Sequence, residues 1–309
     1  MIEAKNLTKV YGDKRAVDDL SFVVRPGIVT GFLGPNGSGK STTMRLILGL
    51  DAPTQGDVTV NGKHFREHRA PLHEAGALLE ARSIHTGRSA YNHLLSLAHT
   101  HGIPRRRVQE LIDLVGLHDV ARKRAGKFSL GMGQRLGIAT ALLGDPSTLL
   151  LDEPANGLDP EGIHWMRNLL KGLAAEGRTV FVSSHLMSEM ALMADHLIVI
   201  GRGALIADTS VEEFVRRASK NLVRVRSPQA TRLRELLVGG GVSVVAVEPG
   251  VLEVAGLTAV EIGETAAANQ IVLHELAQQS ASLEEAFMTL TSDGVEFKAV
   301  DTAPEREAA

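Results

Sequence analysis

One eight-residue segment limits what this chain can fold into more than any other feature. Residues 34–41 read Gly-Pro-Asn-Gly-Ser-Gly-Lys-Ser, which fits the phosphate-binding pattern G-x-x-x-x-G-K-[ST]. An apolar run, Ile28 to Leu33, precedes it and is predicted to be a buried strand, and Thr42 to Leu50 follows as a predicted amphipathic helix. A Gly-rich structural turn is the alternative interpretation, but both flanks favour nucleotide binding.

The loop offers backbone and side-chain groups to a phosphate. Its glycines let the backbone turn sharply, so that N–H groups and the helix N-terminus form a nest for phosphate oxygens. Lys40 adds a positive charge for the β- and γ-phosphates, and the Ser41 hydroxyl is a ligand type that suits Mg²⁺. The residues predicted to bind the nucleotide here are Gly34, Pro35, Asn36, Gly37, Ser38, Gly39, Lys40, Ser41 and Thr42.

Composition sets the outer limits. The 309 residues, 44% of them hydrophobic, suit one large domain or two unequal ones. The net charge of −3 gives no electrostatic reason to expect nucleic acid as a partner. Met1 to Lys5 lacks the apolar core of a signal peptide, and no apolar stretch reaches the ~18 residues needed to span a bilayer. We therefore expect a cytoplasmic chain that reaches the membrane only through a partner.

Residues 1–217 show the alternation of strands and helices that is typical of an α/β sandwich. Short apolar runs predict a parallel sheet covered on both faces, from strands at Ile28–Leu33, Ala77–Leu79, Thr148–Leu151, Thr179–Ser183 and His196–Ile200. An antiparallel subsheet is predicted from Ile2–Leu7, Val17–Val24 and Val58–Val60. Between Ala90 and Ala125 the pattern is helical, with pieces at Tyr91–His101 and Val108–Val115, and predicts a helical subdomain.

Residues 218–300 predict a separate, smaller α+β domain. Leu222–Arg226 and Ile271–Leu273 are predicted strands, and Val242–Val247 with Val251–Val254 suits a hairpin. The predicted helices are Ala230–Val238, Ala259–Asn269 and Ser282–Leu290, the last with Ser282 and Glu285 spaced as a capping box. The polar tail, 301–309, is predicted to be disordered.

Two acids end one of the predicted parallel strands. The run Thr148 to Leu151 is followed by Asp152 and Glu153, about 110 residues after the phosphate loop. A carboxylate at that place can hold the Mg²⁺ that Ser41 also ligates, which predicts Asp152 as a metal residue. Glu153 then lies where a water could attack the γ-phosphate, and it is the candidate general base.

With these acids in place, the chain resembles the ATP-binding subunits of ABC transporters. Their signature, Leu-Ser-Gly-Gly-Gln followed by Arg, corresponds to residues 128–135, Phe-Ser-Leu-Gly-Met-Gly-Gln-Arg. Ser129 and Gly131 stand where the family contacts the γ-phosphate, whereas Leu130 and Met132 depart from the pattern. The resemblance implies that this segment faces the ATP bound by a second copy. A helix is predicted from Gly133 to Leu143, with its N-terminal end aimed at phosphate.

Other segments extend the resemblance. Residues 156–159, Asn-Gly-Leu-Asp, resemble the family's D-loop, and His185 after Ser183-Ser184 resembles its switch histidine, which implies a donor to the γ-phosphate. Tyr11 stands where the family stacks an aromatic ring on adenine; an ordinary surface tyrosine is the alternative. Glu80 replaces the family's Q-loop glutamine, which implies a charged metal ligand and resembles drug- and bacteriocin-type export ATPases.

The resemblance implies a function and its partners. We expect an ATPase that uses ATP and Mg²⁺, pairs with a second copy of itself, and powers export through a separate membrane permease on the inner face of the cell membrane. One alternative is an importer ATPase with a regulatory C-terminal domain, although such proteins usually keep the Q-loop glutamine and the full signature. Another is a soluble ABC ATPase acting on nucleic acid or ribosomes, but the chain has a single cassette and no heptad run.

Overall fold

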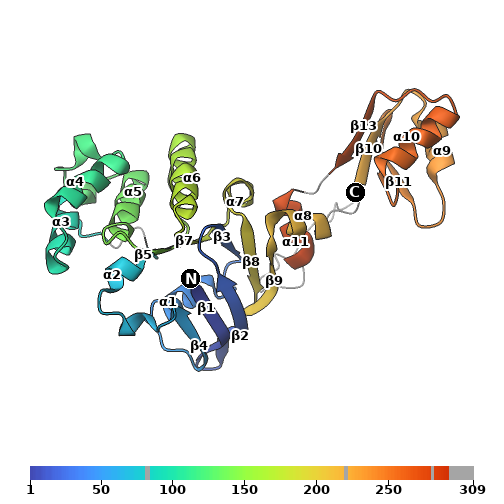
Figure 1. The fold of residues 1–309 in the computed structure, drawn as a ribbon. Coiled ribbons are helices and arrows are strands. Elements are labelled where there is room, and N and C mark those ends of the chain that lie inside the picture. The colour runs from blue at the N-terminus through green and yellow to red at the C-terminus, as the bar shows by residue number, and fades with distance from the viewer. Residues whose placement is uncertain (81–83, 219–221, 280–281, 292–309) are drawn as a thin grey trace, which may run out of the picture. The chain divides into compact units, whose positions relative to one another are not determined.

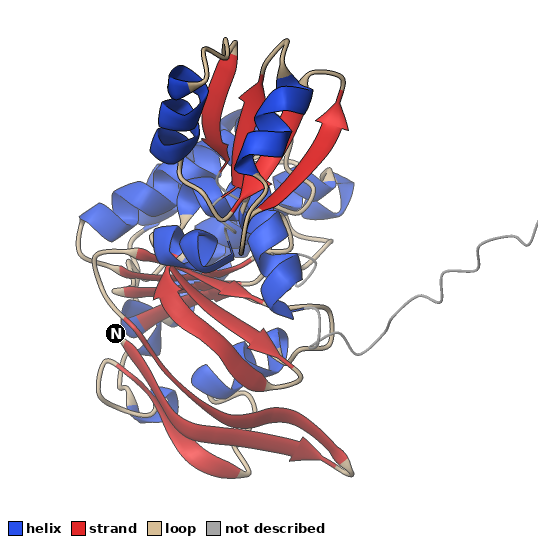
Figure 2. Cartoon of the chain, turned by 90° about the vertical axis from the view of Figure 1, so that its right-hand side faces the viewer, coloured by secondary structure: helices blue, strands red, loops and turns tan. Residues whose placement is uncertain are grey.

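The computed structural model describes residues 1–80, 84–218, 222–279 and 282–291 (Figures 1 and 2). The chain divides into two compact units, one over Met1–Ser210 and the other over Val211–Leu290. The boundary expected after Arg217 stays a prediction, and the tail predicted to be disordered, 301–309, lies outside the described residues.

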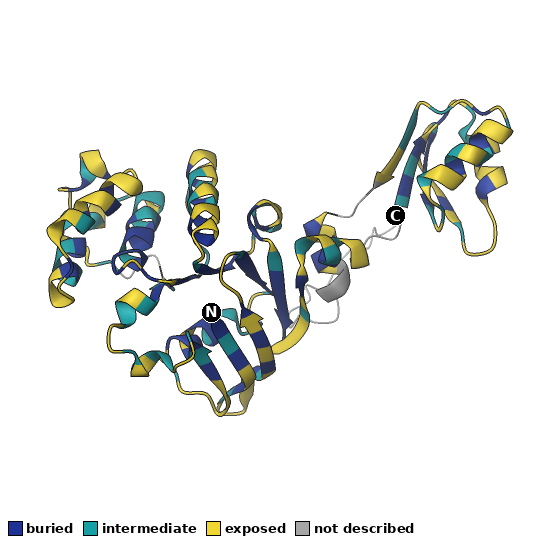
Figure 3. Ribbon diagram, in the orientation of Figure 1, coloured by how far each residue is buried: buried dark blue, intermediate teal, exposed yellow. Residues whose placement is uncertain are grey.

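The first unit is built on a six-stranded sheet with the order β5-β6-β7-β3-β8-β9. Its strands are β3 (Val29–Leu33), β5 (Ala75–Leu78), β6 (Thr148–Leu151), β7 (Thr179–Ser183), β8 (His196–Gly201) and β9 (Ala204–Ser210). All but β9 run parallel, and they lie within two residues of the predicted strands. Every residue of β3, β6 and β7 is buried, as Figure 3 shows, because helices and the second sheet cover both faces.

Strand β9 was not expected from the sequence. Its residues are mostly exposed, and it pairs antiparallel with β8 at the edge of the sheet. The turn between them, Arg202-Gly203, has positive φ at both residues, 50° and 84°, which suits a tight hairpin. At this edge position even the apolar residues 204–207 are mostly exposed, so the strand lacks the pattern of a buried one.

A second, antiparallel sheet has the order β2-β1-β4 and confirms the predicted subsheet. Its strands are β1 (Ile2–Tyr11), β2 (Lys14–Val24) and β4 (Gln55–Val60). Phe22 on β2 packs with Phe32 on β3 and Phe181 on β7, the last two with ring centroids 4.9 Å apart. This aromatic cluster joins the two sheets in one core.

The helices of the first unit place the loops that carry the chemistry. They are α1 (Lys40–Ile47), α2 (Pro71–Glu74), α3 (Ala90–Thr100), α4 (Arg105–Leu114), α5 (Leu130–Ala141), α6 (Pro160–Ala175) and α7 (Met187–Met193). Helix α1 packs on β2 and β4, and α6 packs on β7 and β3. Helices α3, α4 and α5 pack on one another, which confirms the helical subdomain (Figure 1).

The start of α5 corrects the sequence prediction. The helix begins at Leu130, three residues before the predicted Gly133, and Ser129 is its N-cap with the hydroxyl oxygen accepting from Met132 N at 3.2 Å. Gly131 and Gly133 lower the intrinsic helix propensity of this turn, but the cap and the packing of α5 outweigh that cost.

The second unit has a four-stranded antiparallel sheet with the order β11-β12-β10-β13. Its elements are α8 (Val211–Ala218), β10 (Leu222–Arg226), α9 (Ala230–Leu237), β11 (Ser243–Glu248), β12 (Val251–Ala255), α10 (Ala259–Ala268), β13 (Glu275–Gln279) and α11 (Leu283–Thr291). The βαββαβ run from β10 to β13 is that of ferredoxin-like domains. Val223 and Val225 face a core that α9 and α10 complete. The predicted α+β character is confirmed.

Two predictions in this unit have different outcomes. The strand predicted at 271–273 was wrong: Ile271 is buried in the core, and the strand that pairs with β10 is β13, Glu275–Gln279, whose polar edge position gives it no apolar pattern. The capping box was correct, since Ser282 N donates to Glu285 Oε2 at 2.7 Å and Glu285 N donates to Ser282 Oγ at 3.1 Å.

Candidate active site

The phosphate-binding loop connects the buried strand β3 to helix α1. Gly39 precedes α1 with a φ of 105°, which is strained for any residue with a side chain. A Cβ at this position would also collide with the carbonyl oxygen of Ala16, so the loop depends on glycine for two reasons. No side chain caps α1, and its first N–H groups stay available to an anion.

Lys40 is folded toward the loop that precedes it. Its Nζ donates to the carbonyl oxygens of Gly34 at 2.6 Å and Pro35 at 3.1 Å. Burial lowers the pKa of Lys40, and the nearby charges of Glu153 and Asp152 partly oppose that lowering. Phosphate oxygens are stronger acceptors than these carbonyls, so a nucleotide would compete for the ammonium group.

Ser41 and Asp152 meet although 111 positions separate them in the chain. The Ser41 hydroxyl donates to Asp152 Oδ2 at 2.8 Å, because the loop and the end of β6 lie at the same edge of the parallel sheet. A hydroxyl beside a carboxylate is a set of hard oxygen donors, which fits Mg²⁺. These two residues would hold the ion, and its chemistry there would be to neutralise charge on the phosphates.

Glu153 has an unusual backbone that several neighbours hold. Its φ of 51° is in the left-handed region, where a residue with a side chain is uncommon. Its Oε2 accepts from the backbone N of His185 at 3.2 Å and pairs with His185 Nδ1 at 2.6 Å. The carboxylate is about a quarter exposed, with relative accessibility 24%. The structure therefore brings the candidate base and the candidate switch histidine together.

Ser183 takes part in this group, although no role of its own was predicted for it. It is fully buried at the end of β7, and its hydroxyl oxygen accepts from Glu153 N at 3.0 Å while donating to Asp152 Oδ1. One side chain thus fixes both acids. The only sequence signal was its position at the end of a strand next to the acid-bearing strand, since carboxyl ends of parallel strands share an edge of the sheet.

A hollow of about 420 Å³ opens over these residues, a volume suited to a small ligand. Predicted site residues line much of it: Tyr11, Asn36, Gly37, Gly39, Lys40, Ser41, Thr42, Asp152 and Glu153. Tyr11 is 46% exposed at its rim, where its hydroxyl donates to Asp51 Oδ2 at 2.9 Å and Lys9 Nζ lies 4.8 Å from the ring centroid. Ser38 is buried beneath the loop.

Seven predicted residues do not line this hollow. Four of them, Gly34, Pro35, Ser38 and His185, adjoin lining residues in the chain or by a hydrogen bond, and three do not. Ser129 caps α5, and Gly131 lies against the D-loop, where a Cβ on it would come within 2.7 Å of Gly157 O. Glu80 is exposed after β5 and lines a different hollow with Arg45 and Leu48. Among the contacts of the described residues, none joins Ser129, Gly131 or Glu80 to Lys40 or to the two acids, Asp152 and Glu153.

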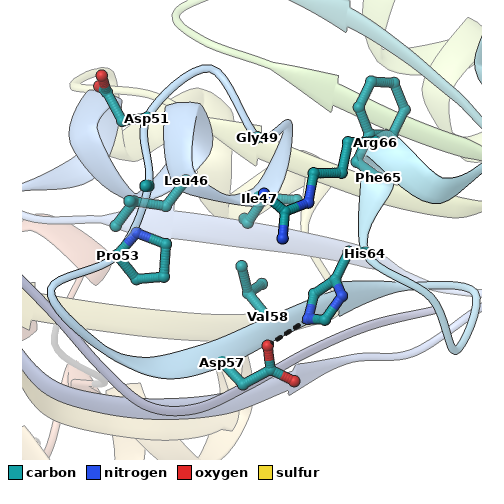
Figure 4. A pocket seen from close by; sticks show the side chains of 11 residues that line it. Leu46, Ile47, Gly49, Asp51, Pro53, Asp57, Val58, His64, Phe65 and Arg66 are labelled. Atoms are coloured by element: carbon teal, nitrogen blue, oxygen red, sulfur yellow. Dashed lines mark hydrogen bonds and ion pairs between the residues drawn. The ribbon is translucent and has the colours of Figure 1, made fainter.

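Another hollow, of about 330 Å³, lies between α1 and β4 and has other lining residues (Figure 4). His64 pairs there with Asp57 at 2.6 Å and with Glu67 at 2.9 Å, and its hydrogen bonds to the Glu67 and Asp57 carboxylates raise the pKa of His64. None of the predicted site residues lines it.

In the described part of the chain, no helix has the length and apolar character required to cross a membrane.

Comparisons with known proteins agree with this geometry. Residues 17–156 match the family described as ABC transporter, and residues 221–284 match a domain of unknown function, DUF8746. The bacitracin transport ATP-binding protein BcrA of Bacillus licheniformis is 42% identical over 225 residues, which cover 72% of this chain and 74% of that protein. The uncharacterized ABC transporter ATP-binding protein YhcH of Bacillus subtilis (strain 168) is 37% identical over 95% of this chain and 96% of its own length.

Two further similarities concern transport direction and assembly. The Nod factor export ATP-binding protein I of Burkholderia orbicola (strain AU 1054) is 33% identical over 76% of this chain and 80% of that protein. A solved dimer of the ATP-binding cassette MJ0796, bound to ADP and Pi, superposes with a TM-score of 0.63 at 26% identity, covering 68% of this chain and 98% of that one.

Proposed function

Since this chain belongs to the ATP-binding subunits of ABC transporters, and to their export type, we propose that two copies of it hydrolyse ATP at shared sites and drive a separate membrane permease. The chain is an ATPase, and its ATP site is the hollow between the phosphate loop and the acids. One observation carries the assignment of roles: Lys40, the Ser41–Asp152 pair and the Glu153–His185 pair line or adjoin one hollow.

We assign the roles by the chemistry of each group. Lys40 and the loop N–H groups hold the β- and γ-phosphates, while Ser41 and Asp152 hold Mg²⁺. Glu153 orients the attacking water and accepts its proton, and His185 holds Glu153 and donates toward the γ-phosphate. Tyr11 at the rim stacks on adenine. Glu80 is proposed as a further metal ligand, and no contact of the described residues supports that role.

A second copy completes each site in this proposal. Ser129 and Gly131 lie outside the hollow of their own chain, although the family resemblance gives them γ-phosphate contacts. The helix that Ser129 caps presents its N-terminal dipole and N–H groups, which are suited to an anion. The solved dimer of a similar cassette supports the two-copy arrangement.

The permease and the cargo follow from the relatives. We propose a separate integral membrane permease that holds this chain on the inner face of the cell membrane, and a peptide antibiotic of the bacitracin kind as cargo, because BcrA is named for bacitracin transport. Neither an importer nor a nucleic-acid ATPase is favoured by these similarities, and nucleic acid is not among the proposed partners.

Growth of a host that lacks this gene tests the transport proposal. Wild-type chain, expressed with the permease encoded next to it, should restore growth in bacitracin, whereas Lys40→Ala should not. If the wild-type chain and Lys40→Ala both restored growth, ATP binding through Lys40 would not be needed for the function. Restoration by neither, with intact ATP hydrolysis by the purified wild type, would reject the cargo and leave the ATPase assignment in place.

A further inference from the structure

A buried glutamine on α5 contacts the backbone of the candidate base. Gln134 is 1% exposed, and its Nε2 donates to the carbonyl oxygen of Glu153 at 3.1 Å. Its Oε1 is also buried and has no hydrogen-bond partner among the described residues. A side chain that served only packing would be better as an apolar residue, because an unpaired buried oxygen destabilises the fold. The retained amide therefore points to the one bond that it makes.

That bond completes a clamp on a strained residue. Left-handed backbone at a residue with a side chain is strained, and it persists where several surrounding contacts hold it. Both backbone polar groups of Glu153 are held by side chains, the N–H by Ser183 Oγ and the carbonyl by Gln134 Nε2. The two peptide planes that flank the candidate base are thus fixed from two different elements, β7 and α5.

Helix α5 touches the acid-bearing loop at a second point. Leu130 and Gly131, at the start of α5, lie against Gly157, so closely that a Cβ on Gly157 would collide with the Leu130 side chain. The loop from Glu153 to Gly157 therefore rests on α5 at both of its ends. Because Ser129 and Gln134 belong to one rigid helical turn and a half, a shift of the N-cap moves the Glu153 carbonyl contact with it.

We propose that Gln134 is a positioning residue, which holds the peptide that follows Glu153 and so sets the place of the candidate base in its own chain. The inference rests on the proposed two-copy function and deepens it by naming a residue that orients the base. Each α5 then serves the nucleotide of the opposite copy with its N-terminus and the base of its own copy with Gln134.

Full-length Gln134→Met tests the positioning role. The thioether keeps the length of the side chain and removes both the donor and the unpaired oxygen. We expect kcat for ATP to fall about tenfold to a hundredfold, since small misplacements of catalytic groups have effects of that order. KM for ATP and the melting temperature should stay close to wild type, because Lys40 and the loop are untouched. Gln109→Met, the same change on α4, is the matched control.

A mixed dimer separates positioning from general damage to α5. A copy with Ser129→Arg keeps a working phosphate loop, and a copy with Lys40→Ala lends it an intact signature, so one composite site works. Adding Gln134→Met to the Ser129→Arg copy should lower hydrolysis, because that copy holds the working base. Adding it to the Lys40→Ala copy should reduce hydrolysis much less, because α5 of that copy contributes only Ser129 to the working site.

The outcomes discriminate sharply. An unchanged kcat in Gln134→Met, or an equal loss from both placements, would overturn the inference. If Gln134→Met fails to fold, Gln134→Leu takes its place with the same two readouts. No hydrolysis from the parent mixture would instead reject the proposed two-copy site, and the kcat of the unmixed variants would still decide the role of Gln134.

Discussion

His185 and Glu153 share one carboxylate oxygen through two hydrogen bonds, from the backbone N and from Nδ1, although 32 positions separate them. A carboxylate only accepts, so the ring nitrogen Nδ1 carries the proton in this contact. The backbone and the ring of one residue thus fix the orientation of the candidate base.

Glu153→Gln should abolish turnover and keep ATP binding. The amide preserves the shape of the side chain but cannot accept the proton of the attacking water, a loss typically of about 10²–10⁴-fold in rate. ATP should then hold the dimer closed, which size-exclusion elution with ATP would show beside an ATPase assay. Turnover within a few-fold of wild type would remove Glu153 from the role of base.

Lys40→Ala should fail at nucleotide binding, because it deletes the charge that meets the phosphates. Equilibrium binding of a fluorescent ATP analogue measures this directly. Burial lowers the pKa of Lys40, so in the nucleotide-free protein the ammonium loses its proton at a lower pH than an ordinary lysine does. As the pH is raised, the affinity of the wild-type protein for ATP should therefore begin to fall at a lower pH than it would if Lys40 had the pKa of a solvent-exposed lysine. Unchanged affinity in the variant would place the phosphate site elsewhere.

Ser129→Arg should bind ATP as a monomer yet neither dimerise nor hydrolyse. Its own phosphate loop is intact, while the added bulk and charge lie at the proposed interface. Mixed with Lys40→Ala it should regain activity, since one composite site carries both lesions and the other carries neither. Mixed dimers that form and never hydrolyse ATP would contradict the shared site.

Asp145→Asn should lower stability at neutral pH by up to about 1 kcal/mol, the size of a partly exposed ion pair. The Arg178 guanidinium, which donates to Asp145 at 2.8 Å, holds the pKa of this carboxyl below its ordinary value. The pair therefore stabilises the fold above the unfolded-state pKa and loses that effect as pH falls through the folded-state pKa. Asn also tolerates the φ of 52° at this position.

Denaturant unfolding of wild type and Asp145→Asn at pH 7 and at pH 3 measures this difference. The gap between the two proteins should narrow at the lower pH. Asp119→Asn, a change at another exposed Asp, is the control and should leave the pH dependence as in wild type. A gap that widens on acidification would show that the ion pair is not its source.

Removal of the C-terminal residues should leave the chemistry intact, because the proposed phosphate, metal and base residues all lie before residue 186. Fragments 1–217 and 1–210 should both stay soluble and melt at a higher temperature with Mg-ATP. The two fragments compare the boundary predicted after Arg217 with the boundary after Ser210 that divides the two compact units. Aggregation of both, or no shift with ATP, would mean that the later residues are part of the ATPase fold.

Much of the fold followed from the sequence where residues are buried on all sides. Runs such as 148–151 are apolar throughout, and β6 and β7 have the predicted ends. Elements at an edge or at a cap were missed. Strands β9 and β13 lie at sheet edges and do not show the pattern of a buried strand, and Ser129 starts α5 across two glycines.

The sequence allowed us to predict which residues form the site better than which of them contact one another. The meeting of Ser41 with Asp152 follows from strand topology, since both leave the sheet at one edge. The roles of Ser183 and Gln134 depend on the backbone conformation of Glu153 and on how α5 packs. The local sequence pattern predicts neither this conformation nor this packing. They required the three-dimensional structure.

The left-handed backbone of Glu153 has an evolutionary consequence. Glycine would adopt a φ of 51° with less strain than glutamate, and asparagine also tolerates it, but neither offers a base. Folding and chemistry thus favour different amino acids at this one position, and only selection for turnover keeps the acid there. In duplicated copies that no longer need to hydrolyse ATP, we expect this position to drift to the residue that the backbone prefers before the phosphate loop decays.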